Sequence, residues 1–89
     1  MRAAFAVLTI EHERGWGSKP DGYIIFKDEA SAKAYVHEQT KDRIPFQAPD
    51  YYVSYDMCGY QPCTEAFEKR VETADRGFVY VDRLSEMLV

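Results

Sequence analysis

Apolar and polar residues alternate with a period of two over several short segments of the chain, which is typical of β-strands. In the first such segment, residues 3–13, Phe5 and Val7 point to one side while Ala6 and Leu8 point to the other. Both faces are therefore apolar, and we expect an interior strand that is covered on both sides. Three further segments have the length and composition of strands, at residues 23–26, 51–57 and 78–81.

The segment after the second predicted strand has the spacing of a helix. Asp28 is suited to be an N-cap for residues 29–39, because its side chain can accept a hydrogen bond from a free backbone N–H of the first turn. Ala32, Tyr35 and Val36 recur at helical spacing and form the expected buried stripe. We therefore predict an amphipathic helix here.

The second helical pattern is weaker. Thr64 can cap a helix over residues 65–75, but the apolar stripe of Phe67 and Val71 is narrow, so an edge strand remains an alternative. A short helix is expected over residues 82–89. Three segments are rich in turn-forming residues and are predicted as loops or turns, at residues 13–22, 41–50 and 58–62.

The predicted elements follow the order β-β-α-β-α-β-α within 89 residues, and no linker or repeat divides them. This order indicates a single domain, residues 1–89, of the α+β class. We expect two layers, a mostly antiparallel sheet of about four strands with helices packed on one face. No apolar run approaches the roughly 18–20 residues that span a bilayer, so we expect no membrane association and a cytoplasmic location.

The charge of the chain is unevenly distributed. The formal net charge is −4, and the second half carries the whole deficit. No Lys or Arg lies between Arg43 and Lys69. Proteins that bind nucleic acid directly need clustered cationic side chains, so we expect no direct nucleic-acid binding. An acidic surface instead favours a protein partner with a basic surface.

The cation-free stretch is also rich in tyrosine, and it provides the first candidate partner-binding surface. Five side chains are expected to face outward there: Tyr52, Asp56, Tyr60, Glu65 and Glu68. Tyrosine rings and carboxylates complement arginine-rich surfaces through cation–π contacts and ion pairs. The alternative is an ordinary solvated strand face with no partner.

Trp16 and Arg14 form a second candidate patch. Trp16 is the only tryptophan, and glycines flank it in a predicted loop. Tryptophan and arginine are the residues most enriched where binding energy concentrates in protein interfaces. The alternative is that Trp16 folds back and covers the core.

Four residues are candidates for metal binding or catalysis. Cys58 and Cys63 have the spacing C-x4-C, and a zinc site would need His12 and His37 to join them. Two buried thiols beside a turn, or an internal disulfide, are the other interpretations. A small enzyme would use a cleft formed by His12, His37 and Cys58, but no G-x-S-x-G, H-E-x-x-H or Walker A motif is present. We expect no enzyme activity and no cofactor.

The tripeptide at residues 11–13 combines two glutamates with a histidine. Alternate residues of a strand share one face, so Glu11 and Glu13 should point to the same side and His12 to the other. The three side chains cannot converge on one metal or substrate without a bulge.

In its overall style the chain resembles small accessory proteins encoded by phages and prophages, among them anti-CRISPR proteins. Three segments carry the resemblance: AFAVLTIEHE, FKDEASAKAYV and PDYYVSYDMCGYQPCTE. The resemblance implies an inhibitor that acts in the host cytoplasm on a defence complex or another nucleic-acid-handling complex.

These observations lead to one functional hypothesis with two alternatives. We expect a small acidic interaction or inhibitor protein that binds a basic protein surface and blocks it by occupancy or acidic mimicry. The alternatives are the small enzyme and a homo-oligomeric module, zinc-stabilised or purely structural. In the last case a homodimer would use the tyrosine-rich face on itself.

Overall fold

A computed structural model describes residues 2–15, 17–41 and 51–89, and for Tyr51 it describes the backbone only. Its elements follow the predicted order and confirm the α+β class. In chain order they are β1 (Arg2–Glu13), β2 (Gly17–Phe26), α1 (Glu29–Thr40), β3 (Tyr51–Cys63), α2 (Glu65–Glu72), β4 (Phe78–Val81) and the 3-10 helix η1 (Leu84–Leu88). Trp16 and most of the predicted loop at 41–50 lie outside the described residues.

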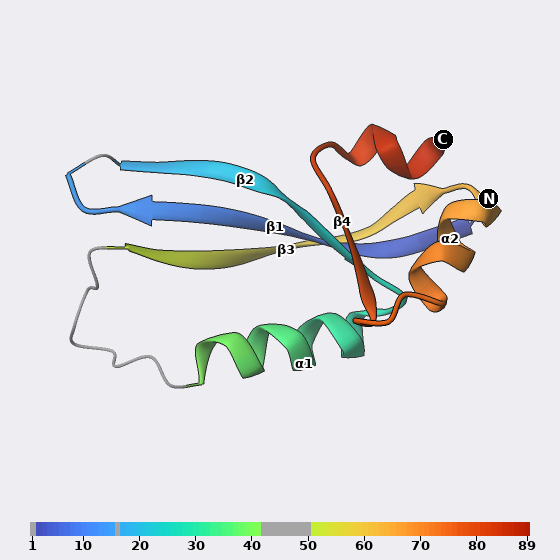
Figure 1. Cartoon of the computed structure of the whole chain (residues 1–89), viewed down its shortest axis with the longest axis horizontal. Helices are drawn as coiled ribbons and strands as arrows, with labels where there is room; N and C mark the ends of the chain where they lie inside the picture. Colours follow the sequence, from blue (N-terminus) through green and yellow to red (C-terminus); the bar gives the residue numbers. More distant parts are fainter. Residues whose placement is uncertain (1, 16, 42–50) are drawn as a thin grey trace.

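The four strands form one antiparallel sheet in the order β3-β1-β2-β4 (Figure 1). β4 pairs only with residues 23–26 of β2. β1, β2 and β3 therefore continue together beyond β4 and η1 as a three-stranded arm, which comprises residues 8–13, 17–22 and 51–56. The arm contributes to the elongated shape of the molecule, 42 × 24 × 20 Å.

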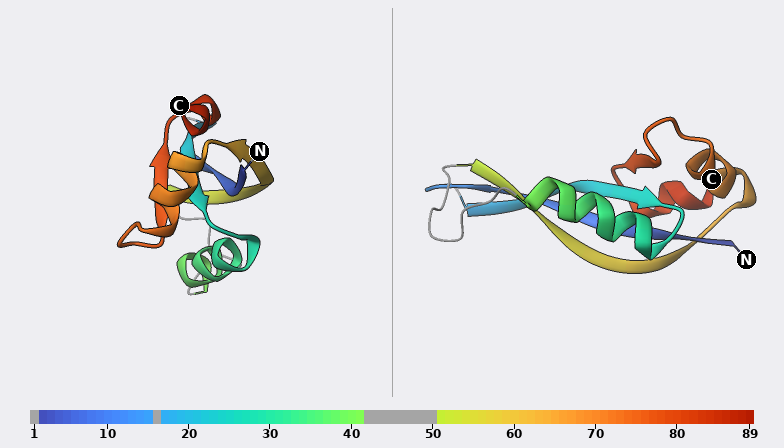
Figure 2. Two further views of the ribbon diagram at one scale, coloured as in Figure 1. Left: turned by 90° about the vertical axis from the view of Figure 1, so that its right-hand side faces the viewer. Right: turned by 90° about the horizontal axis from the view of Figure 1, so that it is seen from below.

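The two α-helices cover opposite faces of the sheet, which corrects the prediction that the helices share one face (Figure 2). Phe5 of β1 packs in one cluster with Ala32 of α1, on what we call the α1 face. The next residue, Ala6, packs in a second cluster with Phe67 of α2 and Met87 of η1, on the α2 face. Because successive strand residues point to opposite sides, apolar residues on both faces of β1 need cover on both sides.

β2 begins earlier than predicted, because much of the turn-rich segment 13–22 pairs with β1. Pro20 lies opposite Ile10, and the register then skips Asp21 so that Gly22 lies opposite Thr9. This part of β2 extends past the end of β4 and forms an edge of the sheet. Proline is tolerated at an edge, where its missing N–H breaks no ladder hydrogen bond.

β3 is also longer than predicted, because the predicted turn at residues 58–62 continues the strand. The register passes from Met57, opposite Val7, to Gly59, opposite Ala6, so Cys58 is the extra residue of a β-bulge. Gly59 has φ +84°, a backbone conformation that glycine adopts without strain. The sequence signal of a turn was in fact the signal of a bulge.

Both predicted N-caps are present. The Asp28 side chain accepts a hydrogen bond of 2.8 Å from Ser31 N–H, and this bond lowers the pKa of the Asp28 carboxyl. The Thr64 hydroxyl accepts one of 3.1 Å from Phe67 N–H. The ambiguous segment is therefore a helix, although α2 ends at Glu72. No helix in the described part of the chain is long and apolar enough to cross a bilayer.

Candidate partner-binding surface

The five residues of the first candidate surface do not lie together. Tyr52 and Asp56 are cross-strand partners of His12 and Leu8 and lie on the α2 face of the arm. Tyr60 lies on the α1 face, because the bulge at Cys58 reverses the alternation between them. Its ring meets Phe5 edge to face at 5.1 Å, and its hydroxyl accepts a hydrogen bond of 3.1 Å from the backbone N–H of Glu29.

Glu65 and Glu68 lie at the other end of the sheet and are neutralised by a cation outside the cation-free stretch. Arg2 is 3.6 Å from Glu65 and 3.0 Å from Glu68, measured between guanidinium nitrogen and carboxylate oxygen. Arg2 and Leu8 are six residues apart on β1, or about 20 Å along a strand. Asp56, which lies opposite Leu8, is therefore far from both glutamates.

The second candidate patch is described in part. Arg14 is exposed in the turn that follows β1, at the tip of the arm. Trp16 is outside the described residues, so the pairing of these two side chains in one patch stays a prediction.

The four candidate metal ligands are scattered. His12 is on the arm, where its ring stacks on Tyr52 at 4.5 Å and its Nε2 lies 2.7 Å from Ser54 Oγ. Cys58 is at the bulge and Cys63 is at the end of β3 opposite Arg2, and burial raises the pKa of both thiols. His37 is exposed on α1. The described residues contain no group of three or more potential metal ligands.

The positions of His12, His37 and Cys58 also test the enzyme alternative. A cleft shared by His12, His37 and Cys58 would need the arm, α1 and the β3 bulge to present side chains to one space. His12 and Cys58 lie on the α2 face of the sheet, whereas His37 belongs to the helix on the α1 face. The structure therefore does not bring these three side chains together in one cleft.

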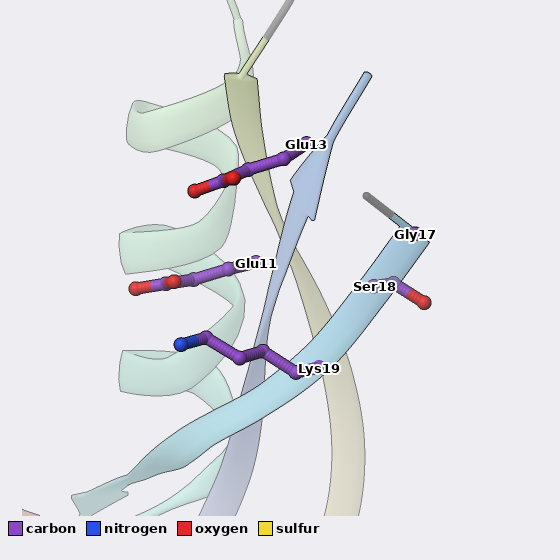
Figure 3. A pocket seen from close by; sticks show the side chains of 5 residues that line it. All are labelled: Glu11, Glu13, Gly17, Ser18 and Lys19. Atoms are coloured by element: carbon purple, nitrogen blue, oxygen red, sulfur yellow. The ribbon is translucent and has the colours of Figure 1, made fainter. Parts of the chain in front are cut away.

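The arm carries an acidic hollow that sequence reasoning identified only in part. It has a volume of about 260 Å³ and is lined by Glu11, Glu13, Gly17, Ser18 and Lys19. Glu11 and Glu13 project to the same side, as predicted, and Lys19 projects with them from the neighbouring strand (Figure 3). Two carboxylates and one ammonium group thus face outward on the α1 face of the arm.

Tyr80 of β4 lies near Glu11, which lines the hollow, and near two further acidic residues. Its side chain is 47% exposed, and its hydroxyl donates a hydrogen bond of 2.6 Å to the backbone carbonyl of Asp21. The pKa of Tyr80 is raised, mainly by partial desolvation and also by the negative charges of Asp21, Asp82 and Glu11. Three carboxylates therefore lie close enough to the tyrosine hydroxyl to disfavour its ionisation.

We call Glu11, Glu13, Asp21, Asp82 and Tyr80 the acidic arm surface. Among the described residues, none of its four carboxylates takes part in an ion pair, whereas glutamates of both α-helices do. Its members come from three strands and the residue after β4. Apart from the shared face of Glu11 and Glu13, strand register brings them together, and the sequence alone does not reveal it.

Comparison with known proteins adds no relative to this picture: no family model, curated protein or solved structure matches the chain.

Proposed function

We propose that this chain is a small interaction protein that binds a cationic surface of another protein through the acidic arm surface. The observation that carries the proposal is the set of carboxylates around Tyr80, which have no ion-pair partner among the described side chains and lie where the projecting arm meets β4. Lys19 lies beside Glu11 and Glu13 and offsets part of this negative charge. The negative charge that remains can steer and orient a partner of opposite sign.

The tyrosine ring adds a contact that charge alone does not supply. An arginine guanidinium can stack on an exposed aromatic ring while it donates hydrogen bonds to neighbouring carboxylates. Tyr80 offers the ring, and Asp21 and Asp82 offer carboxylates beside its hydroxyl. This combination favours arginine over lysine in the partner.

Cationic protein surfaces often bind nucleic acid, so an acidic protein on such a surface would affect that binding. If the bound surface serves nucleic acid, an acidic protein of this size blocks it by occupancy or by mimicry of phosphate charge. The proposal therefore includes inhibition of a nucleic-acid-handling complex, including a defence complex of the host, as its most specific form.

The test is capture of partners from a host lysate on the immobilised chain at about 0.1 M and about 1 M salt, where the screening length falls from about 10 Å to about 3 Å. The arm variant is Glu11→Gln with Glu13→Gln, and the matched control is Glu72→Gln with Asp75→Asn. Each pair removes two exposed or half-buried negative charges. We expect basic proteins to be retained at low salt by the wild type and the control, and to be lost from the arm variant and at high salt.

Quantification by mass spectrometry also defines the result that would end the proposal. Retention of the same proteins by the arm variant, together with their loss from the control, would place the binding surface on α2 and its following turn. Salt-insensitive retention would show that charge is not the basis of recognition.

A further inference from the structure

A second hollow lies where the end of β2 meets the start of β4. Phe26 is the last residue of β2 and Phe78 the first of β4, and they are cross-strand partners. The hollow has a volume of about 260 Å³ and opens between α1 and the segment that follows α2. Its volume is close to the lower limit of about 300 Å³ for pockets that bind small molecules.

Aromatic rings form one wall of this hollow. Tyr35 of α1 lies 5.1 Å from Phe78 and 5.4 Å from Phe26 between ring centroids, and Phe26 lies 5.7 Å from Phe78. Phe26 is buried, whereas Tyr35 and Phe78 are half-buried and line the hollow. Because Tyr35 and Phe78 are only half-buried, part of each side chain is open to contact with a further aromatic ring.

The rest of the lining is polar and carries charge of both signs. Lys27 and Arg76 contribute two positive charges, Glu72 contributes one negative charge, and Ser31 contributes a hydroxyl group. The nearby Asp28 carboxylate, whose pKa the charge of Lys27 helps to lower, already accepts the capping hydrogen bond from Ser31 N–H. The lining residues carry one more positive than negative charge, and the adjacent Asp28 carboxylate offsets that excess.

We propose that this hollow binds a small aromatic monocarboxylate. The ring would lie against Tyr35 and Phe78, and the carboxylate would pair with Arg76 and Lys27. Arginine binds planar carboxylates through two parallel N–H···O bonds. Glu72 would repel a second negative charge, which disfavours dianions such as phosphate monoesters.

This site is separate from the acidic arm surface. Gly17 and Phe26 are the two ends of β2, nine residues and about 30 Å apart along an extended strand. The hollow with Glu11 and Glu13 lies at the Gly17 end, and the aromatic hollow lies at the Phe26 end. Binding at one is therefore expected to leave the other unchanged.

The experiment is a titration of the full chain with phenylacetate, followed by two-dimensional NMR of the backbone amides. We expect saturable shifts at residues that line the hollow, Ser31 and Gly77 among them, with a Kd below about 1 mM, as about ten well-placed non-hydrogen atoms allow. Neutral phenylacetamide keeps the ring but lacks the charge. It should bind roughly tenfold or more weakly, as does phenylacetate to the Arg76→Gln variant.

Lys69→Gln removes a cation from α2 outside the hollow and serves as the control, with an unchanged Kd expected. Arg76 and Lys69 are exposed, so both variants should give spectra of a folded protein. Shifts that never saturate, or equal affinity for acid and amide, would overturn the proposal. Either result would leave partner capture by the acidic arm surface unaffected.

Discussion

Replacement of Ile25 with alanine is expected to lower the free energy of unfolding by about 2–5 kcal/mol, the range for large-to-small changes at fully buried aliphatic residues. Ile25 is completely inaccessible to solvent and lies in β2 between Ala6 of β1 and Val79 of β4. Ile25 packs in the cluster that contains Phe67, Val71 and Met87, so its truncation leaves a cavity within the buried core. Urea unfolding followed by circular dichroism measures the change.

Ile10→Ala is the matched control, because it removes the same atoms from a half-buried position on the arm. Its side chain is on the α2 face, outside the described cluster of residues that packs against α2 and η1. A loss of about 1 kcal/mol or less is expected there. Equal losses at the two positions would contradict the placement of the core around Ile25.

Gly22→Ala should be the second most damaging change, at about 1–3 kcal/mol, the cost of holding a residue in a disfavoured backbone conformation. Gly22 has φ +152°, and a β-carbon there would overlap the hydroxyl oxygen of Tyr80. The substitution must therefore both strain the backbone and displace the tyrosine from its hydrogen bond to the Asp21 carbonyl. Urea unfolding measures the first effect and the ionisation of Tyr80 measures the second.

The sign of the ionisation effect follows from the raised pKa of Tyr80, whose unperturbed value is 10.0. The folded state favours the neutral tyrosine, so this contribution to stability is fully present below pH 10 and is lost as the pH rises through the folded-state pKa. In Gly22→Ala the pKa of the displaced tyrosine should fall toward 10.0 in an ultraviolet titration. A difference titration against Tyr80→Phe assigns the signal to this side chain.

Gly59→Ala separates strain from steric overlap. Gly59 also has a positive φ, +84°, but a β-carbon there would have no neighbour within 4 Å. This variant should be destabilised by backbone strain while the pKa of Tyr80 stays raised. An unchanged Tyr80 titration in Gly22→Ala would show that the ring does not lie over Gly22.

The starts of both α-helices could be predicted from the sequence, because each depends on one capping hydrogen bond. Asp28 and Thr64 mark the starts of the two helices, because a capping side chain acts within three residues. The alternation of apolar residues in β1 also indicated cover on both faces, and this signal should have excluded a single helical layer. Strand ends were predicted less well, since Pro20 and Gly59 are permitted in strands by an edge and a bulge that depend on the partners.

The candidate site was harder to predict, because it depends on register. Tyr52 and Tyr60 are both tyrosines of β3, but one extra residue at Cys58 places them on opposite faces. Conversely, Glu11, Asp21 and Tyr80 are far apart in the sequence and meet across three strands. Glu68 also shows that a carboxylate can be neutralised by a cation that is distant in the sequence, here Arg2.

The most direct test of the account is to map where a defined cationic ligand binds. A short arginine-rich peptide titrated into the isotope-labelled chain at low salt reports contact through backbone amide shifts. We expect the largest shifts at Glu11, Glu13, Asp21 and Tyr80, and their loss in Glu11→Gln with Glu13→Gln. Shifts concentrated on α2, or spread evenly over all acidic residues, would contradict the assignment of the acidic arm surface as the partner-binding site.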